Sequence, residues 1–174
     1  MLTHDEAIED VRCHLQEAWT KGVRDGIEVR DQSTHKMVTI EAPEFANIAK
    51  DETYLPKVRY DVIKTEEPDG GEHFIYPLIK TVNASQTTIR ATQECGERIT
   101  TVGMVELCLY LSKLSHTQAQ EDFITRLLLQ IFRRKQTKEN QVWFKKDARI
   151  TCINPSSGFY RRVLFTNFRF DEIT

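Results

Sequence analysis

Three acidic residues near the middle of the chain could serve a catalytic metal: Asp61, Asp69 and Glu72. A metal-dependent nuclease needs two or three carboxylates and a lysine that converge on one ion. No Asp/Glu-x-Lys sequence follows these acids on a convincing strand, so an acidic hairpin tip is the favoured interpretation. A small metal-dependent nuclease stays open as an alternative.

Other patterns of catalysis are absent from the sequence. It contains no GxSxG nucleophile elbow, P-loop, GxGxxG fingerprint, HExxH zinc motif or EF-hand loop. The five histidines and four cysteines lack metal-ligand spacing, and we interpret the cysteines as free thiols. We therefore expect a protein that is not an enzyme and that binds no cofactor or metal.

Basic residues are concentrated late in the chain. Residues 126–162 carry 10 basic and 2 acidic side chains, whereas residues 1–125 carry 13 basic and 22 acidic ones. A net charge of −2 argues against strong non-specific binding of nucleic acid. A basic patch that meets an acidic protein surface is the more informative hypothesis. The predicted protein interface consists of Arg133, Arg134, Lys135, Lys145 and Lys146.

Two amphipathic helices are expected to position these residues. Thr3 and Glu6 form a capping-box pattern before an apolar stripe that runs to Trp19, with Gly22 as the expected stop. Ser115 and Gln118 form a second such pattern. The stripe that follows comprises Ala119, Phe123, Ile124, Leu127, Leu128, Ile131 and Phe132.

Short runs of alternating or continuous apolar residues predict the strands. They fall at Ile27–Arg30, Met37–Ile40, Lys57–Lys64, Phe74–Val82, Thr100–Leu111, Val142–Phe144, Arg149–Ile153 and Phe159–Phe170. Asp69-Gly70 predicts a hairpin turn, and Pro77 predicts an edge or an irregularity. Thr100–Leu111 is apolar on both faces near its end, which is typical of a central strand covered by helices.

The order of elements predicts one domain over residues 1–174, with a loop-rich insertion around residues 27–56. Its fold class is α+β, a mostly antiparallel β-sheet with two helices packed on one face. In the expected core, one helix meets the most apolar strand. The helix contributes Phe123, Leu127 and Ile131, and the strand contributes Val102, Met104 and Leu109.

Residues 57–174 resemble the tail-terminator family of long, non-contractile-tailed, lambda-like bacteriophages. The resemblance rests on the order of features: Arg98, Thr100-Thr101 and Gly103 before the apolar strand, then the capped helix, then Gly158-Phe159-Tyr160 opening a strand that ends at Phe168–Glu172. The N-terminal helix also fits this family. Residues 26–56 depart from it, since a shorter connection is expected there.

The resemblance implies a virion structural protein without catalysis. Its small α+β protomers would assemble into a hexameric ring that caps the tail tube and meets a head-side neck or stopper protein. DNA would pass through the ring without sequence-specific binding. Such a protein is made in the host bacterial cytoplasm and lies in the virion, at the head-proximal end of the tail. We expect no membrane partner, because no apolar run approaches 18 residues. An alternative is a head-completion or stopper protein, which is more often a small barrel or a helical bundle.

Overall fold

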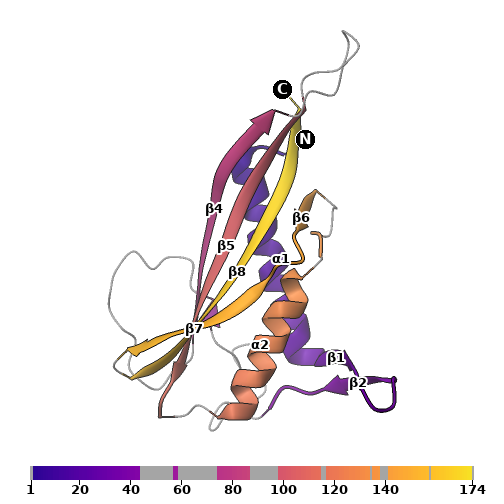
Figure 1. Ribbon diagram of the computed structural model, residues 1–174, viewed down its shortest axis with the longest axis vertical. Helices are drawn as coiled ribbons and strands as arrows, with labels where there is room; N and C mark the ends of the chain where they lie inside the picture. Colours follow the sequence, from indigo (N-terminus) through magenta and orange to yellow (C-terminus); the bar gives the residue numbers. More distant parts are fainter. Residues whose placement is uncertain are drawn as a thin grey trace.

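The computed structural model describes residues 2–43, 57–58, 74–86, 98–114, 117–133, 135–137, 141–156 and 158–173. Ten elements follow one another along the chain (Figure 1). They are α1 (His4–Asp25), β1 (Ile27–Arg30), β2 (Met37–Ile40), β3 (Lys57–Val58), β4 (Phe74–Gln86), β5 (Arg98–Ser112), α2 (Gln118–Phe132), β6 (Val142–Phe144), β7 (Arg149–Ser156) and β8 (Phe159–Ile173). None of the described helices is long and apolar enough to cross a membrane.

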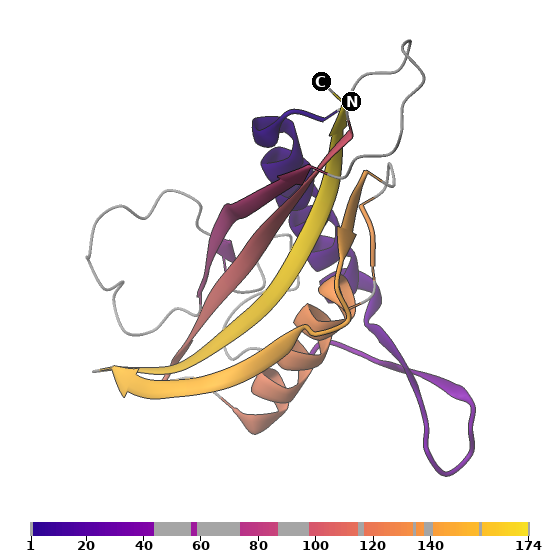
Figure 2. The same cartoon turned by 45° about the horizontal axis from the view of Figure 1, so that its top comes forward.

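The main sheet has the strand order β3-β4-β5-β8-β6, and β7 also pairs with β8. Every pair except β3 with β4 is antiparallel. Both helices lie on the same face of this sheet, as the two views show (Figures 1 and 2). The predicted α+β fold, a mostly antiparallel sheet with two helices on one face, is therefore confirmed.

At Lys57–Val58 the strand before β4 does not pair with β4 as the arm of a hairpin would, and residues 59–64 of that predicted strand lie outside the described residues. Lys57 pairs with Phe74 and Val58 with Ile75 in a parallel register. A tight turn can join only antiparallel neighbours, because a parallel pair needs a crossover connection. Asp69 and Gly70 lie outside the described residues. Strand β3 pairs only with Phe74 and Ile75 of β4. Pro77 follows these two residues and therefore lies at an edge among the described strands, as predicted.

The core lies between the helices and one face of β5. Alternate residues of this strand are buried from Thr101 to Leu111, while the residues between them are half-buried. Leu109 is on the covered face as expected, but Val102 and Met104 point to the other face. The prediction that these two pack beneath α2 is wrong, because successive side chains of a strand alternate between faces. The two described helices cover one face of β5, whereas the sequence suggested helices on both.

Helix α1 begins as the sequence predicts and ends later. The Thr3 backbone N–H donates to a carboxylate oxygen of Glu6 at 2.7 Å, and the Glu6 N–H donates to the Thr3 hydroxyl at 3.3 Å. The helix continues through Gly22 to Asp25, so Gly22 is not its stop. Gly22 is buried against Leu127 of α2, and a Cβ atom there would lie 3.2 Å from Leu127 Cγ and closer to its methyl groups. This glycine lets the two helices approach closely.

Helix α2 is capped two residues later than predicted. Thr117 and Gln120 form the capping box, in place of Ser115 and Gln118. Ser115 lies outside the described residues. The apolar stripe from Phe123 to Phe132 is buried as expected, whereas Ala119 is exposed.

His14 ties α1 to the end of α2. Its Nε2 lies 3.0 Å from the backbone carbonyl oxygen of Ile131, and its ring stacks on Phe144 with a centroid separation of 5.3 Å. A carbonyl oxygen only accepts, so Nε2 is the protonated nitrogen. The contact satisfies one of the carbonyls that the last turn of a helix leaves without an intrahelical partner.

Candidate interaction surfaces

The fold brings together four of the five cations of the predicted interface. Arg133 closes α2, Lys135 follows it, and Lys145 and Lys146 follow β6. All four side chains are exposed. The Phe144 N–H donates to the Lys135 carbonyl at 2.8 Å, which sets the two segments side by side. We call these four residues the basic corner; the fifth cation, Arg134, lies outside the described residues.

Local pairing explains why the corner forms. Gln136 bridges Trp143 in antiparallel fashion, and the Thr137 N–H donates to the Val142 carbonyl at 3.0 Å. The chain after α2 thus returns antiparallel to itself through β6. Phe144 is buried and Trp143 lies on the opposite face, as alternation along a strand predicts. The Arg169 guanidinium lies 5.9 Å from the centre of the Trp143 ring, a cation–π contact that fixes this tryptophan at the sheet surface.

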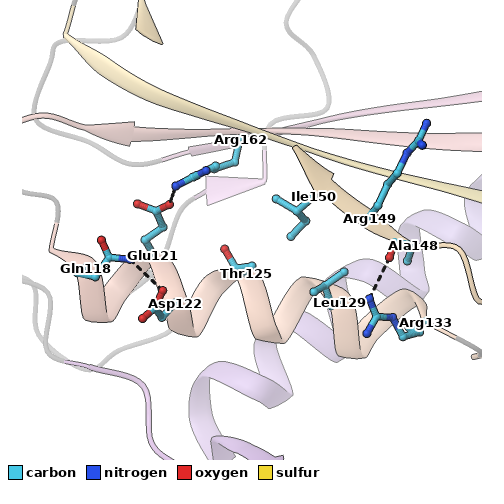
Figure 3. Close-up of a pocket in the computed structure, with 10 residues that line it drawn as sticks. All are labelled: Gln118, Glu121, Asp122, Thr125, Leu129, Arg133, Ala148, Arg149, Ile150 and Arg162. Carbon is cyan, nitrogen blue, oxygen red and sulfur yellow. Dashed lines mark hydrogen bonds and ion pairs between the residues drawn. The ribbon is translucent and has the colours of Figure 1, made fainter. Parts of the chain in front are cut away.

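A groove of about 470 Å³ runs between one flank of α2 and strand β7 (Figure 3). One of its ends is rich in carboxylates. Glu121, whose side chain is only 8% exposed, forms an ion pair with Arg162 of β8. Asp122 accepts a hydrogen bond from the Gln118 amide at 2.9 Å. We call this the α2–β7 groove.

The other end of the α2–β7 groove is basic. The Arg133 guanidinium donates to the Ala148 carbonyl at 3.2 Å, and Arg149 is exposed beside it. Between the two ends lie the half-buried side chains of Leu129 and Ile150 (Figure 3). Among the described strands, β7 pairs with β8 alone. The groove therefore combines an apolar floor with charged ends of opposite sign.

Strands β1 and β2 form a separate two-stranded sheet that extends away from the body (Figure 2). At its root Ile27 is buried, whereas the β2 residues Val38 and Met37 are 44% and 61% exposed. Gly26 joins this sheet to α1 with a φ of 81°, where a side chain would lie 2.7 Å from the Ile40 carbonyl oxygen. We call residues 27–41 the arm.

The tip of the arm is held by Asp31. Its Oδ1 accepts from the Ser33 N–H, the Ser33 hydroxyl and the Thr34 N–H, at 2.7, 2.6 and 2.8 Å. These hydrogen bonds stabilise the carboxylate and lower the pKa of Asp31 from 3.8 to about 2. The Asp31 N–H also donates to the Lys36 carbonyl at 2.9 Å. The arm thus ends in a turn fixed by its own side chain.

The remaining predicted residues have mixed outcomes. The nuclease candidates Asp61, Asp69 and Glu72 lie outside the described residues. Cys13, Cys108 and Cys152 are free thiols, as interpreted from the sequence, and Cys95 lies outside the described residues. Within the described part of the chain, no three His, Cys, Asp or Glu side chains group to hold a metal.

Sequence reasoning missed the groove and the exposed apolar tip of the arm. The groove depends on contacts between α2 and a strand that is separated from it by sixteen residues of sequence, so no local signal marks it. The arm had a signal: Met37-Val38 lies in a short strand flanked by polar residues, with no long apolar run beside it.

Comparisons with known proteins assign no family. No model of a protein family matches the chain, and no curated protein does. Six chains of solved structures match it. One of them, titled only with a sequence identifier, is 10% identical to this chain, with 94% of each chain covered and a TM-score of 0.46.

Proposed function

We propose that this protein is a tail terminator of a long-tailed, non-contractile bacteriophage. In this proposal it is a structural virion protein that caps the tail tube as a hexameric ring and joins it to the head-side neck. The proposal starts from the resemblance of residues 57–174 and from the small α+β protomer that this resemblance implies, a class to which the observed fold belongs. It carries no catalytic step, and DNA passes through the ring without base recognition.

The basic corner is the observation that carries the proposal furthest. A ring requires a heterologous interface, in which one patch meets a different patch on the next copy. The corner gathers exposed cations from two segments of a chain whose net charge is −2. Exposed carboxylates lie elsewhere, along α1, at Asp5, Glu6, Glu9 and Glu17. Complementary patches of this kind select the partner and its orientation. The corner would contact this acidic surface on the next copy or another ring of the neck.

Charge reversal in the corner tests the proposal. Each exposed pair contributes about 0–1 kcal/mol, but a ring repeats every contact. We expect Lys145→Glu with Lys146→Glu to reduce the fraction of capped tail tubes in electron micrographs, while the folded protomer is retained. Capping by the wild type should also weaken near 1 M salt, where the Debye length falls to about 3 Å.

A matched control reverses two exposed cations outside the corner. Lys80→Glu with Arg126→Glu makes the same change in charge, at exposed residues of β4 and α2 that lie outside both the corner and the acidic surface of α1. This variant should cap tubes like the wild type. Equal capping by wild type and corner variant at every salt concentration would contradict the role of the corner, and tubes left bare by the wild type would contradict the function itself.

Two alternatives are separated by simple observations. A stopper protein would bind the head-side connector and leave tube ends bare, and two helices on one sheet face do not match its usual barrel or helical bundle. A nuclease would cleave DNA in a magnesium-dependent manner through Asp61, Asp69 and Glu72. A cleavage assay with and without magnesium distinguishes this last alternative.

A further inference from the structure

We propose that the far face of the main sheet, the face opposite α1 and α2, contacts the phosphate backbone of double-stranded DNA without reading its bases. The choice of duplex DNA rests on the proposed function, in which DNA passes through the ring. The face itself is argued from strand register, exposure and charge.

Side chains alternate between the two faces of a sheet, so the register assigns each residue to one of them. In β8, Leu164 and Phe168 are buried on the face that the helices cover, which places the odd-numbered residues of this strand on the far face. Strand β7 alternates in the same way. Figure 3 shows Ile150 directed toward α2 and Arg149 directed away from it. Arg149 and Arg169 therefore belong to the far face.

Three cations occupy consecutive rows of the far face. Arg169 of β8 pairs with β6, and Arg149 of β7 pairs four residues earlier in β8, at Phe165. Lys145 occupies the row between them, because its backbone N–H donates to the Asn167 carbonyl at 2.9 Å and continues the pairing of β6 by one residue. Four residues of a strand span about 13 Å. All three cations are exposed, and we call them the cationic ladder.

The protomer does not neutralise the cationic ladder. In the described part of the chain, no ion pair joins a ladder cation to a carboxylate. Asp147, in the turn between Lys145 and β7, accepts a hydrogen bond from the Asn167 amide at 3.3 Å. The register places two further carboxylates on the far face, Glu106 and Asp171, and both residues are half-buried. The exposed charge at the ladder is therefore positive.

Two aromatic rings of the far face hold guanidinium groups. The Arg169 guanidinium lies 5.9 Å from the centre of the Trp143 ring, and that of Arg161 lies 5.1 Å from the centre of the Tyr110 ring. A cation held over a ring is positioned before a ligand arrives, which lowers the entropy lost on binding. Proteins that bind single strands offer rings on which bases stack. Here guanidinium groups occupy the rings, which favours contact with the phosphates of a duplex.

Spacing and charge commit the cationic ladder to a phosphate backbone. One strand of duplex DNA presents a phosphate about every 3.4 Å of helix axis, so a ladder of about 13 Å faces about four of them. On the other side of the sheet, α1 carries exposed carboxylates that repel DNA: Asp5, Glu6, Glu9 and Glu17. The net charge of the chain is −2, so the attraction is confined to the ladder and stays weak enough for DNA to move past it.

The salt dependence of DNA binding, measured by fluorescence anisotropy, tests the ladder. Three phosphate contacts per protomer predict that log affinity falls with log salt concentration at a slope of about −2.7 for each protomer bound. Because Lys145 also belongs to the basic corner, the test variant is Arg149→Gln with Arg169→Gln. It should reduce the slope to about a third and weaken binding equally for duplexes of different sequence. The matched control, Lys21→Gln with Arg126→Gln, removes two exposed cations from the helices and should bind like the wild type. Circular dichroism checks that each variant folds.

The outcomes separate this inference from the proposed function. A wild type that caps tubes but binds no duplex at about 50 mM salt, or a ladder variant with the wild-type slope, would overturn the inference and leave the function intact. Tighter binding of single-stranded DNA than of the duplex would overturn it in favour of base stacking. A ladder variant that loses binding to polyglutamate but keeps binding to the duplex would overturn it in favour of an acidic protein partner. Binding of DNA through the ladder by a protein that leaves tubes bare would support the contact and overturn the function.

Discussion

Gly22 offers a sharp test of how the two helices pack. It lies inside α1, where an added methyl group would meet Leu127 of α2 at 3.1 Å from Cδ2 and closer to Cδ1. Leu127 is 3% exposed, so its side chain has little room to move away. Gly22→Ala therefore combines a favourable effect within α1 with an unfavourable one between the helices.

The two effects have comparable magnitudes. Replacing a mid-helix glycine by alanine stabilises a helix by about 1 kcal/mol. Overpacking a close contact costs about 1–3 kcal/mol. We expect a net loss of about 0–2 kcal/mol in the wild-type background, from the difference of these terms. Leu127→Ala alone should cost about 2–5 kcal/mol, because it leaves a cavity.

The sign should reverse in the double variant. Once Leu127→Ala removes the clashing methyl groups, Gly22→Ala should stabilise by about 1 kcal/mol. The four proteins of this cycle are compared by urea unfolding, with equal m-values as the control for a common unfolding transition. The reasoning is refuted if Gly22→Ala changes the free energy of unfolding by the same amount in both backgrounds.

Three further predictions concern other parts of the molecule. Gly103→Ala should destabilise by at least about 1–3 kcal/mol in urea unfolding, since its methyl group would lie 2.7 Å from Cε2 of the buried Phe168 ring; a neutral effect would contradict that packing. The carboxyl of Asp31 should titrate near pH 2 by NMR, so the stability it adds to the arm is complete above about pH 4 and lost as the pH falls toward 2; a midpoint near 3.8 would contradict its three hydrogen bonds. Replacing the candidate nuclease acids Asp61, Asp69 and Glu72 together by their amides should leave tube capping unchanged. Loss of a divalent-metal-dependent activity in that variant would overturn the proposal of a non-enzymatic protein.

The sequence predicted the elements better than the contacts between them. Strands β1, β2 and β6 have the predicted bounds, and both helices lie where the apolar periodicity places them. The errors arise where tertiary contacts decide. Gly22 resembles a helix stop in sequence, yet it lies inside α1, where Leu127 packs on it. The prediction that Val102 and Met104 lie on the covered face was wrong, because apolar residues occur on both faces of β5 and the described helices cover only one of them.

The interaction surfaces also divide into features that the sequence predicts and contacts that it does not. The basic corner was predictable because its cations are close in sequence and flank two recognisable elements. The pairing of Lys135 with Phe144, which unites the corner, needed the structure. The α2–β7 groove was not predictable, since its two ends combine charges from α2, β7 and β8 that no spacing rule connects.

Imaging of tail-tube ends incubated with the protein tests the central claim most directly. Class averages viewed along the tube should show a sixfold ring at one end only, with six copies of the 20.3 kDa chain. Tube ends that remain bare, or that carry an assembly without sixfold symmetry, would contradict the proposal of a tail terminator.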